Sequence, residues 1–195
     1  MQEKANVSLS AFELQLVTDP VWILTKTQII AKVYNLFGDV SQLYQQHQHM
    51  QQLPSALTAL APKISKGENY EGLPYVMLDY PRCFSREDVF AVRSFFWWGN
   101  YFSCTLHLKG VYKQQYAQRI DAAIKHHELN GWYLNATDEE WNHHVHESMQ
   151  LIHTDTDVFS KNIIKITAIH PLQQWNESFA FYESSIKNLM KIIVA

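Results

Sequence analysis

Over the first sixty residues, apolar side chains recur every three or four positions among residues that favour helix. Ser10 is placed to cap a first helix, and Asp19 followed by Pro20 is a typical start of a second. Gly38 predicts a bend or an end in that second helix. The second helix carries a wide apolar stripe, which we expect to face the core: Ile29, Ile30, Val33, Tyr34 and Phe37. The pattern therefore predicts a helical N-terminal layer.

The rest of the chain alternates between strand and helix patterns. Residues 62–72 are polar and contain two glycines, which predicts a loop. The strands expected from β-branched and aromatic runs are residues 73–80, 100–108, 132–135 and 162–170. The helices expected from apolar spacing and capping residues are 85–98, 111–127, a helix from residue 138 onward with a capping box at Thr137 and Glu140, and 173–194.

These elements predict an α+β fold, in which a helical N-terminal layer packs on a four- to five-stranded mixed or mainly antiparallel sheet with covering helices. We expect one globular domain over residues 1–195. A subdomain seam at 62–72 is the alternative, with a helical layer in 1–61 and an alternating strand and helix half in 73–195.

The strand expected at 100–108 alternates clearly between two kinds of side chain. One face carries apolar side chains, and the other carries Tyr101, Ser103, Thr105 and His107. We expect the second face to be the wetter one.

Four bulky aromatic residues, Phe95 to Trp98, follow one another before Gly99. If 85–98 is a helix, successive side chains turn by about 100°, so these rings cannot all enter one core. Phe95 and Trp98 would then point to a second surface. We expect the chain's own first helices to cover them, with a homodimer contact or a ligand as the alternatives.

Composition narrows the class of protein. The 195 residues are 47% hydrophobic and 18% charged, with a formal net charge of −3 and no basic block, so no nucleic-acid partner is expected. No signal-peptide pattern and no apolar run of the ~18 residues needed to span a bilayer is present. Two distant cysteines do not predict disulfides. We expect a soluble, cytoplasmic protein that does not interact with membranes.

The first candidate site is the turn after residues 73–80. A strand that ends where a helix begins exposes free amide groups, and two nearby arginines would add donors for a carboxylate or phosphate. Aromatic walls and a histidine beside an acid would complete a pocket for an anionic or polar small molecule. The residues proposed for this pocket are Asp79, Arg82, Arg86, Trp97, Trp98, Tyr101 and His107. The simpler interpretation is that Ser85 only caps a helix, that the arginines lie on the surface, and that His107 is a structural histidine.

The second candidate is the histidine cluster formed by His143, His146 and His153. On a continuous helix these side chains share one side, and imidazoles bind zinc or a similar divalent transition metal, which would suit a metal-dependent hydrolase. A solvated polar face is the simpler interpretation, because no cysteine or acid completes an obvious ligand set.

The sequence contains no glycine-rich phosphate loop and no GxSxG nucleophile motif. It therefore does not establish whether the protein is an enzyme. Three hypotheses remain: a small-molecule-binding domain, a metal-dependent hydrolase, and a homodimeric interaction protein.

Overall fold

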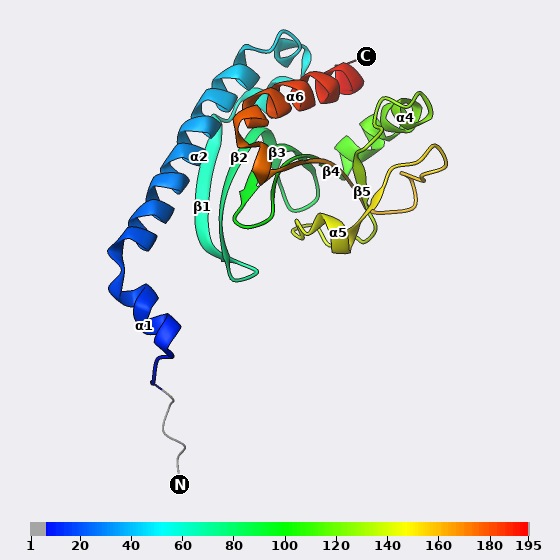
Figure 1. The fold of residues 1–195 in the computed structure, drawn as a ribbon. Helices are drawn as coiled ribbons and strands as arrows, with labels where there is room; N and C mark the ends of the chain where they lie inside the picture. The colour runs from blue at the N-terminus through cyan, green and yellow to red at the C-terminus, as the bar shows by residue number, and fades with distance from the viewer. Residues whose placement is uncertain (1–6, 195) are drawn as a thin grey trace.

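A computed structural model describes residues 7–194, which form a seven-stranded antiparallel sheet with the three longest helices packed on one face (Figure 1). The strand order is β1-β2-β3-β4-β7-β5-β6. The strands are β1 (Lys63–Tyr70), β2 (Leu73–Phe84), β3 (Val89–Trp97), β4 (Tyr101–Lys109), β5 (Tyr133–Asn135), β6 (Met149–Leu151) and β7 (Ile163–Pro171). The α-helices are α1 (Ala11–Thr18), α2 (Pro20–Gln46), α3 (Ser55–Thr58), α4 (Val111–Lys125), α5 (Val145–Ser148) and α6 (Ser178–Val194), with short 3₁₀ helices η1 (Met50–Gln52) and η2 (Leu172–Glu177). The α+β class is confirmed, whereas the predicted four to five strands were too few.

The main core lies between the sheet and helices α2, α4 and α6. Each helix contributes an apolar stripe at helical spacing, and the strands contribute every second side chain. Side chains at the centre of this core include Phe37, Tyr44, Phe96, Phe102, Leu106, Ile166, Tyr182 and Leu189. The Tyr44 hydroxyl is buried there, 3.0 Å from the Ser94 hydroxyl.

Several predicted elements are confirmed. Ser10 forms a complete capping box with Glu13 at the start of α1, and the Asp19 carboxylate accepts from the Val21 amide at the start of α2. Strands β4, β5 and β7 and helices α4 and α6 lie within a few residues of the predicted ranges, although η2 occupies the start of the last one. The bend or end predicted at Gly38 is wrong, because α2 runs through it without interruption.

The loop predicted at 62–72 is wrong as well. Most of it forms β1, whose polar residues suit an edge strand paired only with β2. Glu71 and Gly72, which follow β1, make the hairpin turn, and both have positive φ.

The aromatic run forms a strand, so the helix predicted for 85–98 is wrong. The amides of Glu87 and Asp88 do bond to the Ser85 hydroxyl, as at a helix start, but the Ser85 amide donates to the Asp88 carbonyl at 2.9 Å and closes a hairpin turn between β2 and β3. Rings in a strand alternate between faces. Phe96 accordingly packs on the helices, whereas Phe95 and Trp97 belong to a second cluster on the opposite face.

The opposite face of the sheet is also buried. Residues 136–148 cross it as an irregular segment that includes only the short helix α5 (Figure 1), so the helix predicted from residue 138 is wrong. Two tyrosines fix this segment: the Tyr70 hydroxyl accepts from the His143 amide at 2.7 Å, and the Tyr101 hydroxyl accepts from the Val145 amide at 3.0 Å. The face predicted to be wetter is therefore dry, and Tyr101, Ser103, Thr105 and His107 are each at most 5% exposed.

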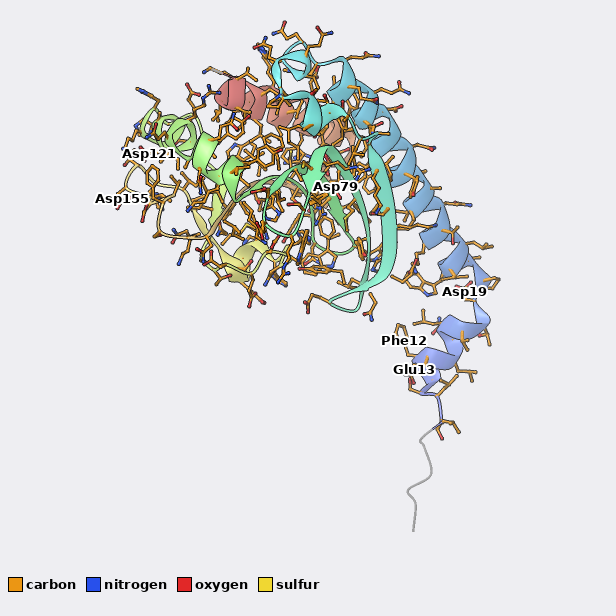
Figure 2. All side chains as sticks on the ribbon, turned by 180° about the vertical axis from the view of Figure 1, so that it is seen from behind. Phe12, Glu13, Asp19, Asp79, Asp121 and Asp155 are labelled. Atoms are coloured by element: carbon orange, nitrogen blue, oxygen red, sulfur yellow. The ribbon has the colours of Figure 1, made fainter. Side chains whose placement is uncertain are left out.

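The N-terminal helices only partly match the predicted layer. Helix α1 contains no buried residue, and the first buried residue of α2 is Ile30. The chain before Ile30 forms an arm that projects from the domain, with Phe12, Glu13 and Asp19 well away from Asp79 (Figures 1 and 2). Only the later part of α2 covers the sheet.

None of the helices within residues 7–194 combines the length and apolar character that crossing a bilayer requires.

The buried Tyr44–Ser94 hydrogen bond yields a stability prediction. Tyr44→Phe leaves the Ser94 hydroxyl without this bond, and we expect a loss of about 1–2 kcal/mol in the free energy of unfolding. Adding Ser94→Ala should recover about 1 kcal/mol of that loss, because no buried hydroxyl then lacks its partner. Urea unfolding of the wild type, both single variants and the double variant measures this coupling. Strictly additive losses would contradict it.

Candidate functional site

The buried face opposite the helices carries a row of polar side chains across four strands. Pairing aligns Asp79 on β2 with Arg93 on β3, Arg93 with Thr105 on β4, and Thr105 with Thr167 on β7. Paired residues point to the same side of a sheet. The Arg93 guanidinium makes two bonds to the Asp79 carboxylate, of 2.7 and 2.9 Å, and the two threonine hydroxyls lie 2.9 Å apart.

A second row lies beside the first and adds the titratable groups. Ala91, His107 and Lys165 are aligned across β3, β4 and β7. Residues 136–148 close over both rows and add His143. The enclosed space is a cavity of about 10 Å³, room for roughly one water molecule. We call it the polar chamber; its lining residues are Phe84, Ala91, Arg93, Thr105, His107, His143 and Lys165.

Lys165 is the most deeply buried cation of the chamber, with 1% of its surface exposed. Its ammonium group donates to the carbonyl oxygen of Asn142 on the covering segment. Among the described residues it forms no ion pair, whereas Arg93 is paired with Asp79 and Lys109 with Glu140. Burial, reinforced by the Arg93 charge, lowers the pKa of Lys165 to about 8.

His107 has a buried ring nitrogen without a hydrogen bond. Within residues 7–194, Nε2 has no hydrogen-bond partner, and the nearest carboxylate oxygen, Oε1 of Glu140, is 3.9 Å away. Burial, together with the charges of Lys165, Arg93 and Lys109, lowers the pKa of His107 to about 3. The ring is therefore neutral at physiological pH.

His143 is held neutral by the same environment. Burial and the Arg93 charge lower the pKa of His143 well below its ordinary value. Its Nε2 accepts a 3.0 Å bond from Nη1 of Arg93, which only an unprotonated nitrogen can do.

Two aromatic rings lie at the edge of the chamber: Phe84 lines it, and Trp141 contacts the lining residues Arg93 and His107. Trp141 and Phe84 have ring centroids 6.0 Å apart, and the Arg93 guanidinium lies 5.5 Å from the Trp141 ring and 6.0 Å from the Phe84 ring. Both side chains are partly open to solvent, Trp141 at 54% and Phe84 at 37%. Phe84 ends β2, and Trp141 belongs to the covering segment.

The structure brings some of the sequence-predicted site residues together and separates others. Asp79 and His107 lie on the same buried face, but β3 separates their strands and Arg93 is the partner of Asp79. Trp97 and Tyr101 pack in the adjacent aromatic cluster. Trp98 packs against the main core on the other face.

The two predicted arginines do not line the chamber. Nε of Arg82 donates to the Ala61 carbonyl at 3.1 Å, and Arg86 is exposed in the β2–β3 turn. The helix N-terminus expected to bind an anion there does not exist, because the turn leads into β3.

Arg93 and Lys165 were missed by the sequence analysis. A signal was present, since each is a lone cation inside an otherwise apolar or uncharged strand pattern, VFAVRSFFW and IIKITAIHP. A charged side chain in such a strand must be paired, buried at a cost or functional.

The histidine cluster is spread out. His143 faces the chamber, the His146 ring contacts Tyr101 and Tyr133, and His153 is exposed. The continuous helix that would have aligned them is absent, and no group of three or more potential metal ligands is found among residues 7–194. The hydrolase hypothesis therefore lacks a supporting ligand geometry in the described chain.

Neutral burial of His107 predicts a pH dependence of stability. The unfolded chain takes up a proton at this residue below about pH 6.5, whereas the folded chain does so only near its pKa of about 3. Stability is therefore lost as pH falls through this window, by about 2 kcal/mol between roughly pH 7 and pH 5 for His107 alone. His107→Gln should remove much of that loss in urea unfolding measurements, whereas His153→Gln, at an exposed position, should not. An unchanged loss in His107→Gln would show that His107 is not held neutral.

Comparison of the chain with protein-family models, with curated proteins and with solved structures finds no match.

Proposed function

We propose that this protein binds a small anion, such as a carboxylate or an inorganic phosphate, in the polar chamber. The observation that carries the proposal is the buried Nε2 of His107, which faces the chamber beside Lys165 and has no hydrogen-bond partner among the described residues. Native proteins rarely leave a buried polar atom unsatisfied, so such an atom facing a cavity suggests a missing ligand group.

The charge balance of the chamber favours an anion. Arg93 and Lys109 each have a carboxylate partner, but the Lys165 ammonium has only a carbonyl oxygen. A buried cation without a counter-ion is costly in a medium of low dielectric constant. An anion near Lys165 would remove that cost and would accept from His107 in its Nε2–H tautomer.

The small size of the closed chamber requires that it open for binding. Residues 137–144 lack regular structure, and Trp141 on this segment is mostly exposed. Displacement of Trp141 and Asn142 would open one side of the chamber without disturbing the strands. It would also release the Lys165 ammonium from the Asn142 carbonyl, so that this donor could bind an anion. Irregular segments of this kind open at low free-energy cost compared with a sheet.

Thermal unfolding in acetate and in phosphate tests the proposal, with sodium chloride at equal ionic strength as the reference. At a concentration of about ten times the Kd, we expect a gain of about 1.4 kcal/mol, which corresponds to a rise of roughly 3–6 °C in Tm for a domain of this size. Lys165→Met should abolish this rise while leaving the free domain as stable as the wild type or more so, because a buried charge is replaced by an apolar chain of similar length.

Lys125→Met is the matched control. Lys125 lies on the surface of α4, on the other face of the sheet from the chamber, where it pairs with Asp121 at 2.6 Å and does not line the chamber. This variant should respond to both anions as the wild type does. A rise that persists in Lys165→Met, or the same Tm in acetate, phosphate and chloride for the wild type, would refute the proposal.

A further inference from the structure

The N-terminal arm exposes an unusual amount of apolar surface. Nine large apolar side chains between residues 7 and 24 are exposed, from 45% for Trp22 to 87% for Val7. They are Val7, Leu9, Phe12, Leu14, Val17, Val21, Trp22, Ile23 and Leu24. Helix α1 is apolar on nearly all sides and has no buried residue. A helix apolar all round is stable in water only when something covers it.

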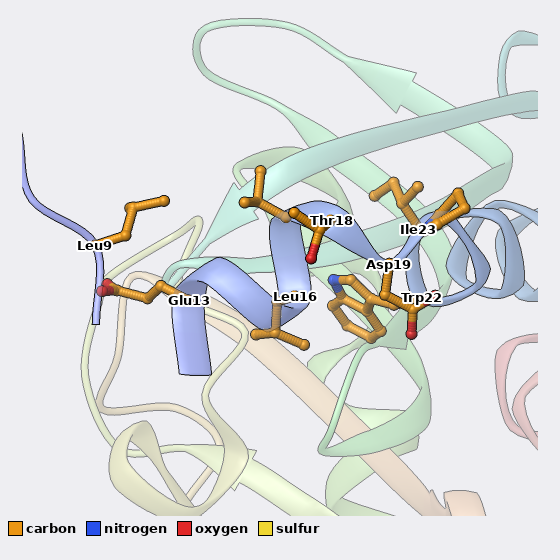
Figure 3. A pocket seen from close by; sticks show the side chains of 9 residues that line it. Leu9, Glu13, Leu16, Thr18, Asp19, Trp22 and Ile23 are labelled. Carbon is orange, nitrogen blue, oxygen red and sulfur yellow. The ribbon is translucent and has the colours of Figure 1, made fainter. Parts of the chain in front are cut away.

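The arm has both a groove and a ridge. The bend between α1 and α2 forms an open groove of about 830 Å³, whose apolar walls include Leu16, Val17 and Ile23 (Figure 3). Phe12 and Leu14 do not line this groove, although both are exposed on the same helix. The same short segment therefore carries exposed apolar side chains, Phe12 and Leu14, and an apolar groove of a kind that accepts such side chains.

The charges of the arm argue against a lipid surface and against a strongly charged partner. Residues 7–25 contain no lysine or arginine, whereas helices that bind membranes at the interface usually carry them on the polar face. The two acidic residues are already used locally: Glu13 accepts from the Ser10 amide, and Asp19 accepts from the Val21 amide. Two copies of the arm, each with a formal charge of −2 over residues 7–25, repel each other only weakly, because Glu13 and Asp19 are exposed and water and salt screen their charges.

We propose that the arm pairs with the arm of a second copy of this chain, across a twofold axis, with Phe12 and Leu14 of each copy in the groove of the other. The exposed side chains provide at most on the order of 500–600 Å² of apolar surface per copy, taking roughly 100 Å² for each fully exposed side chain. A standard interface buries about 800 Å² per partner, and the polar rim of the arm supplies the difference. Because both copies use the same surface in a twofold contact, two copies satisfy each other and no third copy can add.

The anchoring of the arm supports this geometry. Lys26 pairs with Glu68 on β1, and the Trp22 and Trp98 rings meet edge to face with centroids 6.5 Å apart. These contacts fix the direction in which the arm leaves the domain. The arm is therefore already partly ordered in the single chain, which lowers the entropic cost of forming the dimer.

Sedimentation analysis of the full chain tests the proposal. We expect a mass of twice 22.8 kDa at micromolar concentrations, with a Kd below about 10 µM. The double variant Phe12→Glu/Val17→Glu should weaken the dimer at least about tenfold, because two charges would be buried against apolar surface. Its thermal unfolding, measured when it is monomeric, should still show a folded domain, since neither side chain is buried.

Phe159→Glu is the matched control. Phe159 is 52% exposed on the loop before β7, so this variant adds a charge at a comparable apolar position outside the arm and should remain a dimer. A wild-type protein that stays monomeric at about 100 µM would overturn the proposal and leave the arm to a different partner. A dimer that persists undiminished in the double variant would overturn it too, because the interface would then lie elsewhere.

Discussion

Burial of β3 on both faces is the constraint on which the other features of this structure depend. A strand directs successive side chains to opposite sides, so Phe95 and Trp97 cannot share a core with Phe96. The helices α2, α4 and α6 cover one side of the sheet. The other side needs a second cover, and residues 136–148 provide it with the short helix α5 and two tyrosine-bound backbone amides. This arrangement makes a dry layer beneath a segment without regular structure.

The polar chamber follows from that second cover. Arg93 and Lys165 are excluded from water because the segment lies over them, and burial, reinforced by their charges, lowers the pKa of His107 and of His143 so that both stay neutral. Regular secondary structure would make such a cover rigid, whereas an irregular one attached through a few hydrogen bonds can move. The proposed anion-binding function uses this contrast between a fixed polar floor on four strands and a movable wall. The arm differs from the chamber, because it lies outside the covered core and most of its large apolar side chains are exposed, although Trp22 contacts Trp98.

Much of the fold was accessible from the sequence because local chemistry decided it. The capping box at Ser10, the Asp19–Pro20 helix start and the alternation of residues 101–108 depend on neighbours a few positions away. The errors arose where the same local signal serves two structures. Ser85 accepts from nearby amides in a helix cap and in a tight hairpin turn alike, so residues 85–98 were assigned to the wrong class of element. The helix predicted from residue 138 failed because the Tyr70 and Tyr101 hydroxyls bind the backbone of 143–145 from distant strands.

By itself the sequence determined the α+β class and the positions of many elements, but it predicted that the first helices pack on the sheet, whereas α1 has no buried residue. The tertiary structure decided which face of the sheet is dry and which residues meet there. Asp79, Arg93, His107 and Lys165 come from four strands, and their meeting depends on strand order and register, which no local pattern encodes. Whether Arg93 and Lys165 are buried likewise depends on the segment that covers them, residues 136–148. The chamber therefore could not be predicted from local sequence, because it depends on long-range strand pairing and on the covering segment.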